Sequence, residues 1–376
     1  MGLKPGKCIV LVAVLVVLGG FSNAAQLRNV AAVADRAFVE KWENGGRAAI
    51  LDWFSENWFG RKPVERPADE VIGSNYVEMA SGKMRINIHA SLPDCASASN
   101  PAPTFVFGDH SNAGSGSPND YTFRDAIVAR GYAYVRFNLN DIALNVFNSI
   151  GTNGVHTFYG GLGKPDSWGT IAEWAWGFSR VIDWIETQSA LDARRIAVIG
   201  HSRGGKAALW AGCNDKRIAL TISNCSGTGG ARSLRTPVEG CETVDRMSKS
   251  KLTRSWFCDN WFGYANREAE IEHDADDLMK LVAPRLLYVA SGSLDAWAGP
   301  PGEFAAARKA SELWRAYGRK GLSLDRFPAP GVWDHSGEVG YHLRSGRHGL
   351  TLWDWERYMD FMDRRLPGSA PLRESP

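Results

Sequence analysis

Hydrophobic and polar positions along this chain follow two repeating patterns. Met84, Ile86 and Ile88 alternate with polar residues, which predicts a strand with one buried face. Short apolar runs predict further strands at 104–107, 132–137, 196–199, 218–223 and 286–290. Spacings of three and four over 171–185 predict an amphipathic helix, and we expect other helices at 304–317 and 352–364. Alternating strands and helices predict an α/β fold, a mostly parallel twisted sheet with helices on both faces.

The first residues have the pattern of a signal peptide. Lys4 and Lys7 precede an apolar run over 9–18, and small residues around Ser22 and Ala24 form a cleavage site. The alternative is a membrane anchor, but the run is shorter than the ~20 residues that a spanning helix needs. We therefore expect a signal peptide over 1–24 and a secreted or periplasmic protein. A Trp-rich helical extension is expected over 25–75, followed by the α/β domain over 76–370.

Composition excludes several classes of protein. The 376 residues are 44% hydrophobic and 22% charged, as in an ordinary globular protein. A net charge of +2 without a long Lys or Arg run indicates neither a nucleic-acid partner nor an acidic membrane surface. The cysteines after residue 24 lack the close paired spacing of a zinc site. A disulfide is permitted in an exported chain, but the sequence does not specify one, and buried inert thiols are the simpler expectation.

The motif that carries chemistry is Gly200-His-Ser-Arg-Gly204, which fits G-x-S-x-G. A predicted buried strand precedes it and a helix-forming run over 206–211 follows it, which is the context of a nucleophile elbow. The glycines are expected because a side chain beside the strained serine would collide with the strand or the helix. Ser202 is therefore the predicted nucleophile, and the Arg203 backbone N–H is placed to stabilise an oxyanion.

A serine nucleophile needs a histidine base and a carboxylate that orients it. In an α/β-hydrolase both follow the serine along the chain. His335, His342 and His348 are all candidates on stretches that we expect to be loops, and His348 leads by its position before the last helix. Asp295 follows the strand at 286–290 and would lie at the carboxyl edge of the sheet, where α/β active sites form. A capping or solvated Asp295 is the alternative.

Longer segments resemble the glucuronoyl esterase family of carbohydrate esterases, in its bacterial form. They are V-I-G-H-S-R-G-G-K-A-A-L-W-A-G at 198–212, I-S-N-C-S-G-T-G-G at 222–230, W-F-C-D-N at 256–260 and G-Y-H-L-R-S-G-R-H at 340–348. The resemblance extends over roughly residues 35 to 365. It implies an α/β-hydrolase that cleaves the ester between 4-O-methyl-glucuronic acid of glucuronoxylan and lignin alcohols, through an acyl-enzyme and without metal or cofactor. The alternatives are an acetyl xylan or other uronate esterase, and an inactive carbohydrate-binding homologue.

The resemblance also implies roles for individual residues. Ser202 is the nucleophile, His348 is the base, and the Arg203 side chain joins its backbone N–H at the oxyanion. Lys206, Glu242 and Trp297 hold the sugar, although core packing is a serious alternative for Trp297 in a chain with 15 Trp. The expected partner is a carbohydrate ester substrate, with no nucleic acid, no membrane after signal cleavage, and a monomeric protein.

Two departures from the fungal pattern change the expected site. Cys225 stands where that pattern has the catalytic acid, and a thiol cannot stabilise an imidazolium as a carboxylate does. Some bacterial members carry the acid after the next strand, a position that Asp295 fits, so Asp295 is the expected acid. In addition, His201 and Gly349 occupy the places of a fungal cysteine pair that flanks the serine and the histidine, so that disulfide is absent.

Overall fold

The computed structural model describes residues 35–110, 118–145 and 154–366. The predicted signal peptide over 1–24 lies outside these ranges and stays a prediction, as do the expected boundaries at 75 and 370. Across the described ranges, no helix has both the length and the apolar character that crossing a membrane requires.

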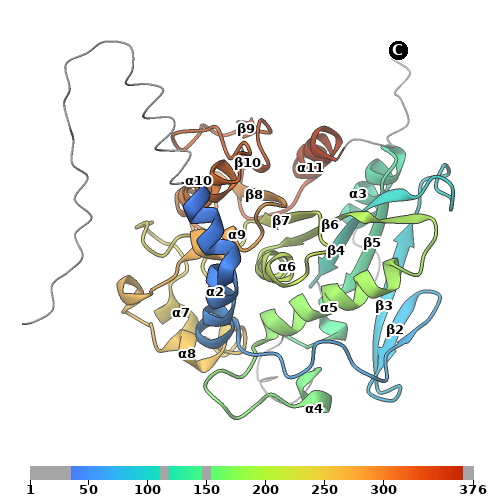
Figure 1. Cartoon of the computed structure of the whole chain (residues 1–376), viewed down its shortest axis with the longest axis horizontal. Helices are drawn as coiled ribbons and strands as arrows, with labels where there is room; N and C mark the ends of the chain where they lie inside the picture. Colours follow the sequence, from blue (N-terminus) through green and yellow to red (C-terminus); the bar gives the residue numbers. More distant parts are fainter. Residues whose placement is uncertain (1–34, 111–117, 146–153, 367–376) are drawn as a thin grey trace, which may run out of the picture.

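A central sheet organises the molecule (Figure 1). The described residues contribute ten strands to it in the order β1-β2-β3-β5-β4-β6-β7-β8-β10-β9. The pairs from β5 through β4, β6, β7 and β8 to β10 are parallel, while β1, β2, β3 and β9 pair antiparallel at the two edges. The strands are β1 (Val71–Ile72), β2 (Tyr76–Met79), β3 (Met84–Ser91), β4 (Ala102–Asp109), β5 (Ala133–Asn138), β6 (Leu191–His201), β7 (Leu220–Asn224), β8 (Leu286–Gly292), β9 (Trp333–Asp334) and β10 (Val339–Arg344).

Helices cover both faces of this sheet. They are α2 (Arg47–Phe54), α3 (Pro118–Ala129), α4 (His156–Tyr159), α5 (Thr170–Ile185), α6 (Arg203–Asn214), α7 (Val244–Lys249), α8 (Asp259–Phe262), α9 (Ala275–Lys280), α10 (Pro300–Ala316) and α11 (Leu352–Arg365), with the short turns η3 (Leu139–Asp141), η4 (Thr253–Ser255) and η5 (Glu268–Glu270). Successive strand residues point to opposite faces. Val198 therefore joins the core formed with α5, α6 and α10, whereas Ile199 joins the core formed with α3 and α11. The predicted α/β-hydrolase architecture is confirmed.

The N-terminal helical segment packs into the same core. It consists of η1 (Trp42–Gly46), α2 and η2 (Ser55–Phe59). Trp58 stacks on Trp261 with ring centroids 4.3 Å apart, and Phe59 stacks on Trp210 of α6 at 4.2 Å. These contacts tie the segment to the helix that follows the nucleophile elbow.

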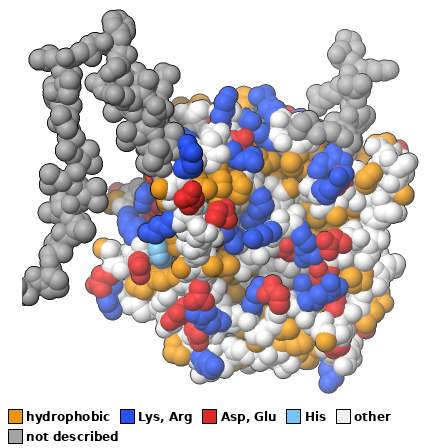
Figure 2. Space-filling view, in the orientation of Figure 1, with side chains coloured by type: hydrophobic (Ala, Val, Ile, Leu, Met, Phe, Trp, Pro, Cys, Tyr) orange, Lys and Arg blue, Asp and Glu red, His pale blue; other side chains and the backbone are white. Residues whose placement is uncertain are grey.

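On the face shown in Figure 2, acidic and basic side chains are interspersed.

The hydrophobic patterns found the central strands and the long helices, but they missed the edges. β1, β2, β9 and β10 were not predicted. His342, expected in a loop, lies in β10 with its side chain fully buried, so that expectation was wrong. Its register is set by pairing with β8, which sequence alternation alone does not reveal.

Candidate active site

The strand–turn–helix at Ser202 has the geometry of a nucleophile elbow. Ser202 connects β6 to α6 with φ 57° and ψ −126°, a conformation that a non-glycine residue rarely adopts. A Cβ at Gly200 would lie 2.0 Å from the carbonyl oxygen of Gly204, so Gly200 must lack a side chain. Arg203 is the first residue of α6, where backbone N–H groups have no intrahelical acceptor. The turn thus presents a hydroxyl beside a free amide and the positive end of a helix dipole.

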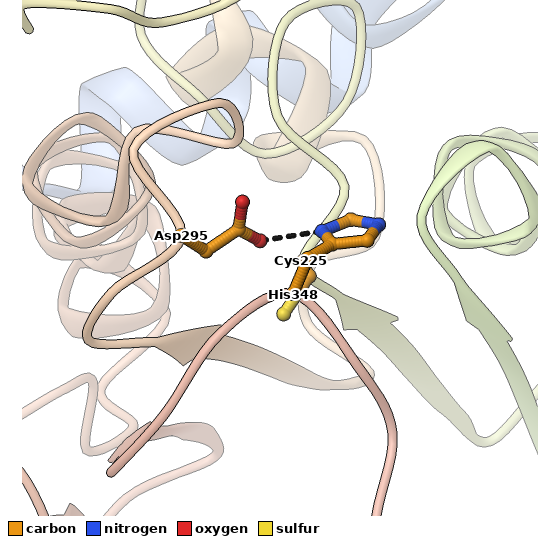
Figure 3. A group of neighbouring side chains, drawn as sticks. All are labelled: Cys225, Asp295 and His348. Carbon is orange, nitrogen blue, oxygen red and sulfur yellow. Dashed lines mark hydrogen bonds and ion pairs between the residues drawn. The ribbon is translucent and has the colours of Figure 1, made fainter.

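His348 and Asp295 point toward one another from two neighbouring loops (Figure 3). His348 lies on the loop between β10 and α11, and Asp295 lies on the loop after β8. The distance from His348 Nδ1 to Asp295 Oδ2 is 2.5 Å. Burial opposes ionisation of Asp295, but the hydrogen bond and charge of His348 outweigh it, so the pKa of Asp295 lies below its usual range. A carboxylate bonded to Nδ1 orients the ring and leaves Nε2 for proton transfer.

A single pocket brings most of the sequence-predicted residues together. Ser202, Lys206, Glu242, Trp297 and His348 all line it. Asp295 is 3% exposed and lies behind His348. Trp297 is 49% exposed, so the core-packing alternative for this residue is wrong. The pocket is completed by Cys225, Ser226, Gly227, Trp256 and Ala298.

Lys206 is buried with a full set of partners. Its Nζ donates to the carbonyl oxygens of Ser226 and Thr228, both at 2.6 Å, and to Glu242 Oε2 at 2.9 Å. An ammonium has three protons, so these three acceptors satisfy it completely. Glu242 is itself 2% exposed, and its backbone N–H donates to the carbonyl oxygen of Trp297 at 2.9 Å. The ion pair therefore holds this wall of the pocket in place and also sets the charges that the wall carries.

The Arg203 side chain is held by residues that the sequence did not single out as functional. Arg203 Nη1 donates to Asn145 Oδ1 at 2.6 Å, and Trp256 Nε1 donates to the same oxygen at 2.9 Å. Burial lowers the pKa of Arg203. Trp256 lay within a quoted family motif and could have been noticed, whereas Asn145 carried no signal in the sequence. Together they orient the guanidinium next to the elbow.

Cys225 occupies the carboxyl end of β7 beside the His348–Asp295 pair. Its Sγ and the donor atoms of Asp295 and His348 lie within 4.8 Å of one another, which makes the trio a set of possible metal ligands in the described part of the chain. His348 Nδ1 is already engaged with Asp295, so this nitrogen could bind a metal only if that bond were broken. Burial, followed by the charges of Glu303 and Asp295, raises the pKa of the thiol. The trio fits a protonated thiol next to an acid–base pair.

Glu303 of α10 is a second buried acid close to the pocket. Its Oε1 accepts from the backbone N–H of Gly227 at 2.9 Å, and its Oε2 accepts from Ser291 Oγ at 2.7 Å. Burial raises its pKa to about 7, although both hydrogen bonds oppose this shift. Gly227 lines the pocket, so its hydrogen bond to Glu303 helps to hold the loop after β7 in place.

The other two candidate bases belong to a different, buried network. Tyr288 Oη lies 2.8 Å from His335 Nε2 and 3.1 Å from His342 Nδ1. His342 Nε2 lies 2.9 Å from Asp354 Oδ1. Neither histidine lines the pocket of Ser202. Of the three histidines that the sequence offered, His348 is the one that the fold brings to the serine.

Known proteins resemble this chain in both sequence and structure. The family described as "Glucuronyl esterase, fungi" matches residues 77–318. The carbohydrate esterase MZ0003, from an unknown prokaryotic organism, is 40% identical over 247 residues, which cover 65% of this chain and 56% of that protein. A 4-O-methyl-glucuronoyl methylesterase from Podospora anserina is 30% identical over 258 residues, 67% of this chain and 50% of that protein. The chain thus spans about half the length of these relatives.

A solved structure, the glucuronoyl esterase from Solibacter usitatus, has the same fold. It superposes with a TM-score of 0.76 at 29% identity and covers 86% of this chain and 93% of its own. The family match over 77–318 includes Ser202, Lys206, Glu242 and Asp295 but ends before His348. By this match and this shared fold, the chain belongs to the glucuronyl esterase family.

Proposed function

We propose that this protein is a serine esterase that hydrolyses glucuronate esters of plant cell-wall carbohydrate, with Ser202, His348 and Asp295 as its catalytic triad. The observation that carries the proposal is the 2.5 Å bond between His348 Nδ1 and Asp295 Oδ2 beside a pocket that Ser202 also lines. The names of two relatives, a carbohydrate esterase and a 4-O-methyl-glucuronoyl methylesterase, support the substrate class.

The proposed reaction has two halves. Ser202 Oγ attacks the ester carbonyl carbon while His348 Nε2 takes the hydroxyl proton, and His348 then gives that proton to the leaving alcohol. Water activated by His348 next attacks the acyl-enzyme and releases the uronic acid. In both halves the backbone N–H and the guanidinium of Arg203 stabilise the oxyanion, and Asp295 stabilises the imidazolium.

Recognition of the sugar is assigned to three other residues that line the pocket. Trp297 lines the pocket and is about half exposed, which suits stacking of its indole on a pyranose. Glu242 and Lys206 line the pocket as charged groups for sugar hydroxyls. Because three acceptors already use the protons of Lys206, a sugar hydroxyl would bind it by sharing or displacing one of them. We also propose that the apolar segment over 9–18 directs export, where such a substrate would be met.

The test is hydrolysis of methyl 4-O-methyl-glucuronate by the purified protein and by Ser202→Ala. We expect a burst of methanol release from the unaltered protein that is absent in the variant. Methyl galacturonate and acetylated xylan serve as competing substrates. A higher kcat/KM on acetylated xylan would replace the uronate assignment with an acetyl esterase, and binding without turnover of any ester would indicate a carbohydrate-binding homologue.

A further inference from the structure

The loop that carries His348 is wrapped around one buried guanidinium. Arg344, the last residue of β10, donates from Nη2 to the carbonyl oxygen of Arg347 at 2.7 Å and to that of Gly349 at 3.0 Å. These two residues flank His348 in the chain. A third bond runs from Arg344 Nη1 to the carbonyl oxygen of Ser345 at 3.1 Å. One side chain thus fixes the backbone on both sides of the proposed base.

The guanidinium is itself anchored to the fold. Its Nε lies 3.0 Å from Asp354 Oδ2, and both residues are at least nine-tenths buried. Asp354 also accepts from the backbone N–H and the Oγ1 of Thr351, each at 2.7 Å, in the capping box of α11. His342 of β10 approaches the other carboxylate oxygen at 2.9 Å. Arg344 therefore connects the His348 loop to both a central strand and the last helix.

The loops of the base and the acid are also joined at this point. The backbone N–H of Ser293 donates to the carbonyl oxygen of Arg344 at 2.8 Å. The backbone N–H of Leu294 donates to the carbonyl oxygen of Gly346 at the same distance. Gly346 has φ +122°, and a Cβ there would lie 2.9 Å from Arg344 Nη1. The chain turns around the guanidinium where only glycine leaves room for it. Movement of Arg344 would consequently shift His348 relative to Asp295.

We propose that Arg344 is a positioning residue that holds His348 against Asp295 and toward Ser202. This inference rests on the proposed function for the role of His348, but it concerns the geometry of the base and not the identity of the substrate. Arg344 suits the task because its guanidinium donates to three carbonyl oxygens and a carboxylate from nitrogens spread over a planar fork. A lysine has three protons on one nitrogen, so it cannot supply these four bonds.

The experiment compares Arg344→Lys and Gly346→Ala with Arg130→Ala as a matched control. Arg130 is also a partly buried arginine paired with two carboxylates of α11, Asp360 and Asp363, but it has no hydrogen bond to the His348 loop. Each protein is assayed on methyl 4-O-methyl-glucuronate and on p-nitrophenyl acetate. Proton NMR then follows the far-downfield signal of the hydrogen bond between His348 and Asp295.

For Arg344→Lys and Gly346→Ala we expect kcat to fall about 10- to 100-fold on both substrates, because a misplaced base affects every ester. KM should change less than about twofold, and the downfield signal should weaken or vanish. Arg130→Ala should lower the melting temperature while keeping kcat and the signal. Unchanged kcat with an unchanged signal in Arg344→Lys would overturn the proposal. If Arg344→Lys does not fold, Arg344→Gln decides in the same way. Gly346→Ala strains the loop through its positive φ and serves as a positive control for displacement of His348.

Failure of the proposed function would have a different signature. A protein that hydrolyses p-nitrophenyl acetate but no uronate ester would refute the substrate class, and Arg344 would still be judged by kcat on the acetate. If neither ester were hydrolysed, the downfield signal in the unaltered protein, and its loss in Arg344→Lys, would still decide the role of Arg344.

Discussion

Replacing Lys206 with methionine separates its structural role from its role in binding. The change removes the ammonium but keeps most of the side chain, and it leaves the carboxyl group of Glu242, which is 2% exposed, without its counter-charge. Removing one partner of a buried ion pair costs about 3–5 kcal/mol, so we expect the free energy of unfolding to fall by that amount. Urea denaturation with linear extrapolation measures it. Lys249→Met, which removes an exposed pair with Asp245, should have little effect.

The double variant Lys206→Met/Glu242→Gln sharpens this test. With both charges gone, the loss should be smaller than the sum of the single variants by about 2 kcal/mol. Kinetics complete the test. The loss of transition-state stabilisation, calculated from kcat/KM of Lys206→Met, should be about 1.5–3 kcal/mol greater on methyl glucuronate than on p-nitrophenyl acetate, which is the value of a hydrogen bond to a charged group. A Lys206→Met protein within about 1 kcal/mol of the unaltered stability would refute the ion-pair reasoning. Equal kinetic losses on both substrates would refute the sugar contact.

Three further variants probe the remaining groups of the site. Asp295→Asn should lower kcat by about 10⁴-fold with little change in KM, because an amide neither fixes the tautomer of His348 nor stabilises its cation; full turnover would remove Asp295 from the triad. Asn145→Ala should lower kcat on uronate esters about 10-fold by releasing the Arg203 guanidinium, and a rise in KM alone would contradict this. Glu303 has its pKa raised from 4.5 to about 7, so its neutral form favours folding below pH 4.5 and that stability is lost as pH rises to 7. Glu303→Gln should therefore gain up to about 3 kcal/mol relative to the unaltered protein between pH 4.5 and 7.5 in urea unfolding, and a pH-independent difference would contradict this.

The parts of this site that the sequence predicted are those set by local chemistry. The elbow at Ser202 needs a glycine on each side of one strained residue, and the five consecutive residues 200–204 show this pattern directly. Buried parallel strands leave continuous apolar runs, so β4 to β8 and the carboxyl edge that bears Asp295 were also predictable. β10 is buried too, but Gly340, His342 and Arg344 interrupt its apolar pattern, and it was missed. Edge strands such as β9 are two residues long and carry no such signal.

Contacts between distant segments could not be predicted from one sequence. Asn145 meets Arg203 across 58 positions, and nothing in its neighbourhood marks it as a partner. A buried lysine needs acceptors, but two of the three that Lys206 has are backbone carbonyls, which any residue could supply. The histidines present the same difficulty, because only the structure shows that His342 lies buried within β10 while His348 lies on the loop after it.

The position of the acid shows how this sheet accommodates a thiol at Cys225. β7 and β8 are adjacent parallel strands, so their carboxyl ends meet at the same edge of the sheet, beside His348. An acid on either loop could approach Nδ1, and here it comes from β8, 2.5 Å away. Cys225 then has to be neutral, because a thiolate would add a second buried negative charge beside Asp295, and burial raises its pKa accordingly. Cys225→Asp should therefore lower kcat despite restoring a carboxylate, since two acids would share one imidazole; an unchanged kcat in that variant would contradict this argument.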